Sequence, residues 1–219
     1  MNANRAFKPL VFLAAATPAA VLALDALRGN LGADPIAALL HRTGWWALTL
    51  LLVTLAVTPI RRLSGWNGVI RVRRMLGLFA FFYATMHFCI YIGLDQFFAL
   101  SFILEDVAKR PYITVGFSAL LMLSALALTS TKGWIRRLGK RWQRLHQLVY
   151  VAAVAGVVHF YWQVKADTRE PLIFATILAV LFIARLRFRR RPPRRRAPVP
   201  ATPVPPARAE EPETVGIPS

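Results

Sequence analysis

Three of the four histidines in this chain lie within or at the start of long apolar segments, where an ionisable side chain is costly and usually functional. His87 and His159 lie deep in two such segments, and His146 lies at the start of the segment that holds His159. A neutral imidazole can ligate a metal, alone or within a cofactor, or it can hydrogen-bond one helix to another. His41 falls in a predicted outer loop before a tryptophan pair, and we interpret it as an interfacial polar residue.

Two of these histidines are predicted to lie at the same height. If each apolar segment is a helix, His87 lies about 20 Å above the charged start of its segment, His159 about 24 Å and His146 only about 5 Å. Two helices that present one imidazole each at one level could clamp a bis-His heme b between them, with its apolar faces packed among side chains. The alternative is a transporter or scaffold in which the histidines only bond helices together.

Arg73 is predicted to lie below His87 and level with His146, because fourteen residues of helix return to within about 40° of the starting face. An arginine there suits a heme propionate, a flavin phosphate or a quinone head group. We take Arg73 and the adjacent Arg74 as candidate cofactor-binding residues. Thirteen residues turn an ideal helix by about 220°, so His146 and His159 do not share a face of a straight helix. Both can be ligands if the helix is locally distorted, or if His146 ligates from the helix end.

The elements that carry these residues are six apolar segments, each long enough to cross a membrane as a helix of about 20 residues. The predicted spans are 10–27, 44–60, 75–94, 112–129, 145–163 and 171–187. Pro59 is predicted to mark a helix end and Pro111 a helix start, whereas the kink at Pro18 is expected to be absorbed by a neighbouring helix. The predicted fold class is an all-α integral membrane protein with six transmembrane helices in a heme-binding bundle.

The charges give this bundle a predicted orientation. The segments outside the spans form two alternating sets, and the set that includes both termini holds 22 of the 28 Lys and Arg residues. That set is the N-terminus, 61–74, 130–144 and the tail from 185; the other is 28–43, 95–110 and 164–170. The positive-inside rule therefore predicts that both termini are cytoplasmic. Basic clusters at the ends of apolar runs indicate contact with lipid rather than with nucleic acid.

The last thirty or so residues have a different composition from the rest. Pro, Arg, Ala and Glu without an apolar period predict a disordered, basic and Pro-rich cytoplasmic tail over 189–219, after a single membrane domain over 1–188. The single cysteine, Cys89, excludes an intramolecular disulfide and a Cys-ligated iron–sulfur cluster. The chain has no dinucleotide-binding glycine motif, phosphate-binding loop, HExxH zinc motif or nucleophile elbow.

Two strings carry a family resemblance: RRMLGLFAFFYATMH at 73–87 and RWQRLHQLVYVAAVAGVVHFYWQ at 141–163. The first string contains R-x-LGL and then F-x-Y-x-x-x-H. The second contains W-x-x-LH-x-L-x-Y, with a second histidine thirteen residues after the first. Over about residues 7–188 the chain resembles the heme-binding membrane subunit of bacterial protein-methionine-sulfoxide reductase systems. That family is part of the wider ferric-reductase-like transmembrane group.

The resemblance implies that His87, His146 and His159 occupy heme-ligand positions, with heme b in one or two copies and FMN as cofactors. It implies a multi-pass protein of the bacterial inner membrane that takes electrons from the quinol pool. Those electrons would reach a periplasmic molybdopterin-containing reductase that repairs methionine sulfoxide in proteins. The chain would then be an electron-transfer subunit rather than the catalytic one. A stand-alone ferric reductase of the same fold is the alternative within the group, and no residue identifies a flavin site.

Overall fold

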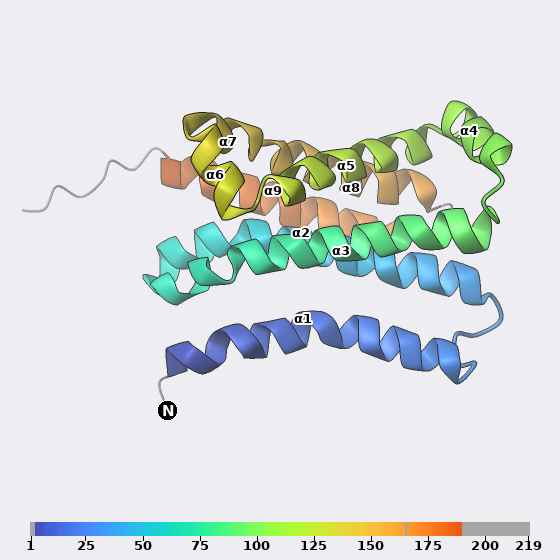
Figure 1. Cartoon of the computed structure of the whole chain (residues 1–219), viewed down its shortest axis with the longest axis horizontal. Helices are drawn as coiled ribbons and strands as arrows, with labels where there is room; N and C mark the ends of the chain where they lie inside the picture. Colours follow the sequence, from blue (N-terminus) through green and yellow to red (C-terminus); the bar gives the residue numbers. More distant parts are fainter. Residues whose placement is uncertain (1–2, 165, 190–219) are drawn as a thin grey trace, which may run out of the picture.

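The computed structural model describes residues 3–164 and 166–189, and within them it contains helices and no strand. Figure 1 shows a bundle whose long helices run along the longest axis of the molecule. These are α1 (Ala3–Leu27), α2 (Pro35–Ser64), α3 (Arg73–Ile90), α5 (Pro111–Leu128), α8 (Leu148–Gln163) and α9 (Arg169–Arg189). The shorter elements are the 3-10 helix η1 (Asn67–Arg71), the π-helix η2 (Tyr91–Asp95), α4 (Leu100–Lys109), α6 (Lys132–Leu138) and α7 (Lys140–Leu145). The predicted all-α membrane fold is confirmed.

Within the residues that the structure describes, five helical stretches are long and apolar enough to cross a membrane, and they correspond to the first five predicted spans. They are Ala6–Leu27, Pro35–Ser64, Arg73–Asp95, Pro111–Leu128 and Lys140–Gln163. Among the described residues α9 is not one of these five, and its apolar part lies between Glu170 and Arg185. It nevertheless packs against α2 and α8. The sixth span therefore stays a prediction.

The second helix is longer than the sequence predicted. Asp34 caps its start by accepting a hydrogen bond from the backbone N–H of Ala37 at 2.9 Å, and Pro35 occupies the first helical position. His41 therefore lies on α2 rather than in a loop, and its exposed imidazole lies 3.6 Å from Glu170 of α9. The prediction that Pro59 ends the helix was also wrong, since α2 continues to Ser64. Pro111, by contrast, starts α5 as predicted.

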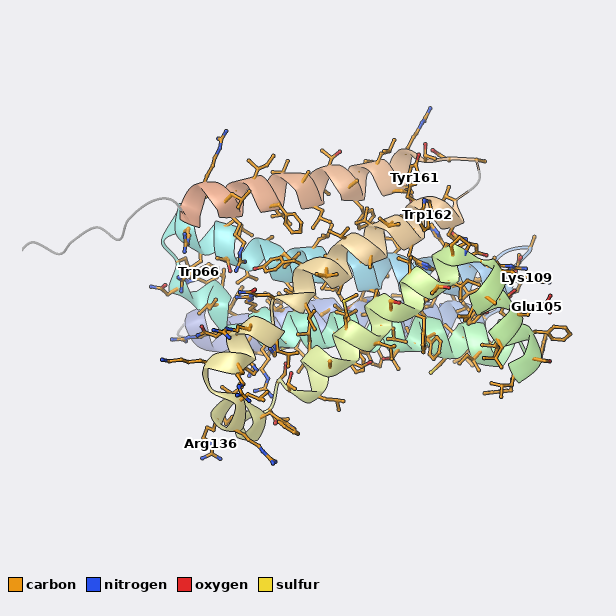
Figure 2. All side chains as sticks on the ribbon, turned by 90° about the horizontal axis from the view of Figure 1, so that it is seen from above. Trp66, Glu105, Lys109, Arg136, Tyr161 and Trp162 are labelled. Atoms are coloured by element: carbon orange, nitrogen blue, oxygen red, sulfur yellow. The ribbon has the colours of Figure 1, made fainter. Side chains whose placement is uncertain are left out.

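The two basic segments at 61–74 and 130–144 lie at one end of the bundle, where α1 begins and α9 ends (Figure 1). We call this the α6 end and the opposite one the α4 end. Arg136 on α6 points away from the bundle there (Figure 2). Such clustering is what the alternating charge pattern requires, and the assignment of this end to the cytoplasm stays a prediction. The tail predicted at 189–219 lies outside the described residues, except for Arg189 at the end of α9.

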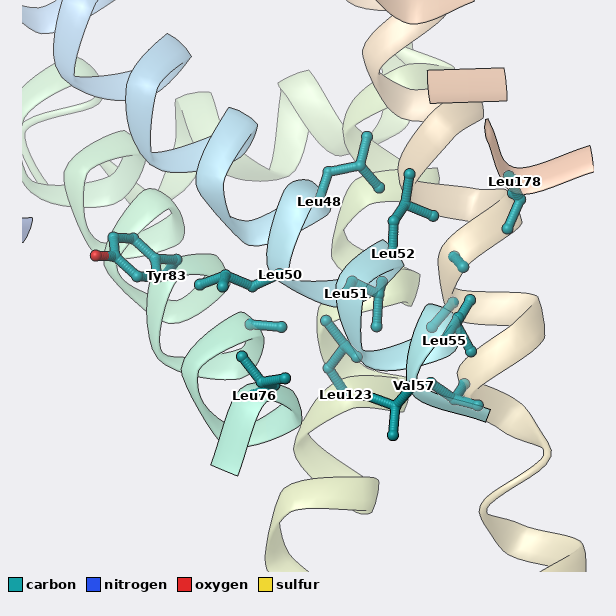
Figure 3. Close-up of a cluster of buried hydrophobic side chains, with 14 of the residues drawn as sticks. Leu48, Leu50, Leu51, Leu52, Leu55, Val57, Leu76, Tyr83, Leu123 and Leu178 are labelled. Atoms are coloured by element: carbon teal, nitrogen blue, oxygen red, sulfur yellow. The ribbon is translucent and has the colours of Figure 1, made fainter. Parts of the chain in front are cut away.

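The core of the bundle is built around α2, which contacts α1, α3, α8 and α9. A helix that is apolar on all sides suits such a central position. Figure 3 shows its buried side chains between Tyr83 and Leu76 of α3, Leu123 of α5 and Leu178 of α9. The buried side chains from α2 are Leu48, Leu50, Leu51, Leu52, Leu55 and Val57. This packing fixes α2 and α3 against each other on the α6 side of His87, whose contacts on α2 are at Leu40 and Gly44.

Tyr83 attaches α1 to this core. Its side chain is fully buried, and its hydroxyl donates to the Ala15 carbonyl and accepts from the Ala19 N–H, both at 2.9 Å. An α-helix normally joins these two backbone groups directly, but Pro18 lies between them and its ring crowds the preceding turn. The hydroxyl of a neighbouring helix therefore satisfies backbone groups beside the proline, as expected for Pro18.

We predict that Tyr83→Phe weakens the attachment of α1. The change keeps the ring but leaves two buried backbone groups without their shared partner, which costs about 1–3 kcal/mol. The midpoint of thermal unfolding of the detergent-purified protein should fall by several degrees. Tyr161→Phe is the matched control, because the Tyr161 side chain is exposed. Equal midpoints for the two variants would show that the Tyr83 hydroxyl contributes nothing to stability.

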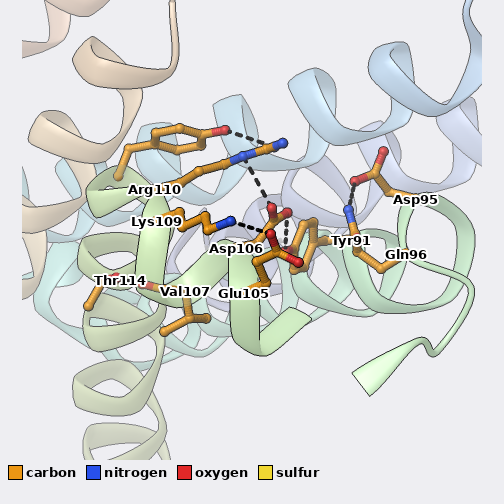
Figure 4. A network of polar contacts seen from close by, with 10 residues as sticks. Tyr91, Asp95, Gln96, Glu105, Asp106, Val107, Lys109, Arg110 and Thr114 are labelled. Carbon is orange, nitrogen blue, oxygen red and sulfur yellow. Dashed lines mark hydrogen bonds and ion pairs between the residues drawn. The ribbon is translucent and has the colours of Figure 1, made fainter. Parts of the chain in front are cut away.

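At the α4 end a polar network links η2 to α4 and α4 to α5 (Figure 4). The Tyr91 hydroxyl donates to Asp106 at 3.0 Å, and Arg110 pairs with the same carboxylate at 3.1 Å. Hydrogen bonding to the Tyr112 hydroxyl and the nearby Asp106 charge raise the pKa of Arg110. Thr114 of α5 donates to the Val107 carbonyl at 2.6 Å. These contacts fix α4, and with it the start of α5 beside the candidate site.

Candidate functional site

His87 of α3 and His159 of α8 meet inside the bundle, in the half nearer α4. Their ring centroids lie 6.1 Å apart with an angle of 85° between the ring planes. The two helices pack chiefly on other partners, α3 on α2 and α8 on α5, and they approach each other at few positions. The predicted proximity of the two imidazoles is confirmed, and their role as ligands stays a prediction.

Each of these imidazoles is oriented by a backbone carbonyl of another helix, α2 for His87 and α5 for His159. Nδ1 of His87 lies 2.9 Å from the Leu40 carbonyl of α2, and Nδ1 of His159 lies 2.7 Å from the Tyr112 carbonyl of α5. A carbonyl can only accept, so Nδ1 carries the proton in both rings and Nε2 keeps its lone pair. Neither Nε2 forms a hydrogen bond within the described residues. This is the tautomer in which a histidine ligates a metal through Nε2.

The close approach of both rings depends on a glycine four residues after the accepting carbonyl. A Cβ at Gly44 would lie 3.2 Å from Nδ1 of His87, and one at Gly116 would lie 2.6 Å from Nδ1 of His159. Real Cβ atoms essentially never show the second distance, so His159 could not keep its position beside an alanine. The same arrangement therefore occurs twice. In each case the imidazole donates to a backbone carbonyl and lies over the glycine four residues further along the same helix.

The centroid separation of this pair equals that expected for two imidazoles that share one iron. Two imidazoles on opposite sides of one metal, with metal–nitrogen bonds of about 2 Å, have ring centres about 6 Å apart. No group of three or more His, Cys, Asp or Glu side chains that could hold a bare metal ion occurs in the part of the chain that the structure describes. A porphyrin iron needs only two axial ligands from the protein, because the macrocycle supplies the other four.

His146 lies where the fifth predicted helix is interrupted. α7 ends at Leu145, His146 follows as its cap, and α8 begins at Leu148. The His146 ring stacks on Trp142 with centroids 3.9 Å apart, and its Nδ1 lies 3.2 Å from the Trp142 carbonyl. His146 thus lies at a helix end, which was one of the two arrangements considered from its spacing to His159.

Arg73 and Arg185 form a cationic cluster beside His146, near the α6 end. Arg73 at the start of α3 is close enough to act electrostatically on His146, Tyr150 and Arg185. The Arg185 guanidinium lies over the Tyr150 ring, 4.6 Å from its centroid. Neither arginine pairs with a carboxylate among the described residues, so the cluster can accept an anionic group. Arg74, predicted together with Arg73, is exposed and is not part of this cluster.

Sequence reasoning found the histidines and Arg73 but missed the groups that orient the rings. Leu40 and Tyr112 act through their carbonyls, and a carbonyl leaves no signal in the sequence. Gly44 and Gly116 did leave one, since a glycine within an apolar helix often marks a close approach. Connecting each glycine to its histidine required knowledge of which helices are neighbours.

Comparison with known proteins shows the family of the chain. Residues 43–157 match the family described as the ferric reductase like transmembrane component. The chain is 53% identical over 182 residues to the protein-methionine-sulfoxide reductase heme-binding subunit MsrQ of Herminiimonas arsenicoxydans. The aligned residues cover 82% of this chain and 84% of that protein. It is 52% identical over 208 residues to the protein of the same name from Xanthomonas axonopodis pv. citri (strain 306), covering 90% and 95%.

Proposed function

The chain belongs to the ferric reductase like transmembrane family, and within it to the heme-binding subunits of protein-methionine-sulfoxide reductases, so we propose that it is a membrane electron-transfer subunit. In this proposal heme b lies between His87 and His159. The observation that carries this proposal is the pair of imidazoles whose centroids lie 6.1 Å apart. Both rings donate Nδ1–H to a backbone carbonyl and keep Nε2 for a metal.

When bound, heme supplies a one-electron carrier in an apolar interior. His87 and His159 would hold its iron, and the carbonyls of Leu40 and Tyr112 would fix the ring orientation and raise the basicity of each ligand. The Thr43 hydroxyl, 3.3 Å from Nδ1 of His87, adds a further contact to that imidazole. These groups hold the ligands in place before the cofactor arrives, so little reorganisation accompanies electron transfer.

The proposal assigns a second cofactor position to the cluster around His146. Arg73 and Arg185 supply positive charge there, which suits a propionate of a second heme or the phosphate of FMN. His146 is the candidate third iron ligand, since its Nδ1 is turned to the Trp142 carbonyl and Nε2 is left for a metal. The ratio of extracted heme and flavin to protein decides between these occupants.

In the proposed electron path, quinol in a bacterial inner membrane is the donor and a periplasmic molybdopterin-containing reductase that repairs methionine sulfoxide is the acceptor. The clustering of basic loops at the α6 end supports a cytoplasmic position for that end and for both termini. The α4 end, nearer to His87 and His159, would then face the acceptor. A stand-alone ferric reductase would need no such partner, and a transporter or scaffold would need no heme.

The proposal predicts a low-spin b-type spectrum for the protein purified in detergent from heme-replete cells. The measurement is the reduced-minus-oxidised visible difference spectrum, followed by reoxidation on addition of a purified periplasmic molybdopterin-containing methionine-sulfoxide reductase. Reoxidation that needs both the reductase and methionine sulfoxide supports the subunit role. Reoxidation by ferric chelates alone favours the stand-alone reductase, and a colourless protein rules out the electron-transfer proposal.

A further inference from the structure

A cavity of about 400 Å³ lies between α1 and α2, and none of the candidate histidines lines it. Its wall on α1 includes Thr17, Pro18 and Val21, and its wall on α2 is formed by Arg42 and Trp46. The cavity is open rather than enclosed, and Val21 is half-exposed. Since α1 is a span, the cavity opens toward lipid, and its volume is in the range of pockets that hold small organic ligands.

The lining is apolar except for Thr17, Arg42 and Trp46, and the Thr17 hydroxyl already donates to the Leu13 carbonyl at 2.8 Å. Arg42 donates to Asp25 of α1 at 2.7 Å, which uses only part of its five N–H groups. The indole N–H of Trp46 has no hydrogen-bond partner within the described residues, and its ring meets Trp45 edge-on with centroids 5.0 Å apart. A flat apolar ring with oxygen atoms at its edge matches this combination, because the indole offers a face and the guanidinium a donor.

The cavity and His87 lie on two sides of the same turn of α2. Arg42 lines the cavity, and the next residue, Thr43, lies 3.3 Å from Nδ1 of His87. An α-helix with its side chains is about 10–12 Å across, so a ring in the cavity would lie on the order of 10 Å from His87. No other membrane helix needs to intervene between them.

We propose that this cavity binds the ring of an isoprenoid quinol, with Arg42 donating to a ring oxygen and Trp46 packing against the ring. The inference rests on the proposed function, for which it supplies the donor site. Oxidation breaks both O–H bonds and gives the quinone, two electrons and two protons. The two electrons would leave one at a time across α2, and their one-electron acceptor would be the heme that His87 and His159 hold in the proposed function. The protons pass to water through the Asp25 carboxylate, whose side chain is 28% exposed.

The test is photolabelling of the full detergent-purified chain with an azido-substituted benzoquinone that carries a short isoprenoid tail, followed by peptide mass spectrometry. Labelling is expected on 14–22 or 42–46, and a short-chain ubiquinone should compete with it whereas excess phosphatidylglycerol should not. Ala14→Phe fills the cavity, and Ala20→Phe is the matched control because Ala20 is exposed on the same helix but does not line the cavity. Labelling should fall about tenfold or more in the first variant and stay at the wild-type level in the second.

Arg42→Gln keeps the cavity open and removes the charged donor, so it should also reduce labelling about tenfold. Labelling at the cavity that phosphatidylglycerol competes away would overturn the proposal in favour of a lipid-filled groove, as would labelling elsewhere in the chain. A wild-type protein with a dithionite-reducible b-type spectrum but no quinone labelling rejects this site and leaves the proposed function standing. A colourless protein that is labelled at the cavity rejects the electron-transfer function and leaves the quinone site.

Discussion

Replacing His87 or His159 with alanine should abolish the low-spin b-type spectrum that we expect of the wild-type protein. Each variant removes one of two imidazoles whose centroids lie 6.1 Å apart, so the remaining ring could hold an iron from one side only. Loss of a partner that merely orients a ligand lowers metal affinity about 10–100-fold, and loss of the ligand itself should cost at least as much. We therefore expect heme occupancy to fall about tenfold or more in each variant.

The measurement is the pyridine hemochrome content per chain, together with the reduced-minus-oxidised spectrum of the same sample. His41→Ala is the matched control, because His41 is an exposed histidine on α2 that pairs with Glu170 at 3.6 Å. It should retain full heme content. A His159→Ala protein with wild-type heme content and a low-spin spectrum would show that these two imidazoles do not share an iron.

The positions of His87 and His159 could be predicted because a helix has a fixed rise. Once two segments are taken as spans that start from charged ends, residue counts alone give the height of each imidazole. The counts do not say which way a side chain points. That His87 turns to α2 and His159 to α5 depends on helix packing, and packing involves residues far apart in the sequence.

The structure differs from the sequence-based expectations at three places, each for a local reason. His41 and Arg42 made 28–43 look like a loop, although two exposed polar side chains are compatible with the first turns of a helix capped by Asp34. α4 was not predicted because its short apolar stretch lies between charged residues. Arg74 was paired with Arg73 on sequence proximity, but adjacent residues on a helix point about 100° apart. Only Arg73 is therefore turned toward the cluster around His146.

Gly116→Ala should displace His159 without changing any candidate ligand. The added methyl group would lie 2.6 Å from Nδ1 and 2.8 Å from Cε1 of the imidazole, so the ring or α5 must move. Either movement disrupts the hydrogen bond from Nδ1 to the Tyr112 carbonyl, which is 2.7 Å long. Because that bond fixes the ring and its tautomer, we expect a loss of heme affinity of about 10–100-fold.

A graded series of glycine variants separates this effect from a general loss of stability. At Gly44 the new methyl group would lie 3.2 Å from Nδ1 of His87, so Gly44→Ala should lower heme content less than Gly116→Ala does. At Gly77 it would lie 3.6 Å from a Thr54 methyl group, which is an ordinary contact, and heme content should not change. All three changes raise helix propensity by about 1 kcal/mol, so propensity cannot produce this order. Equal heme content in all three variants would mean that neither glycine sets the position of its histidine.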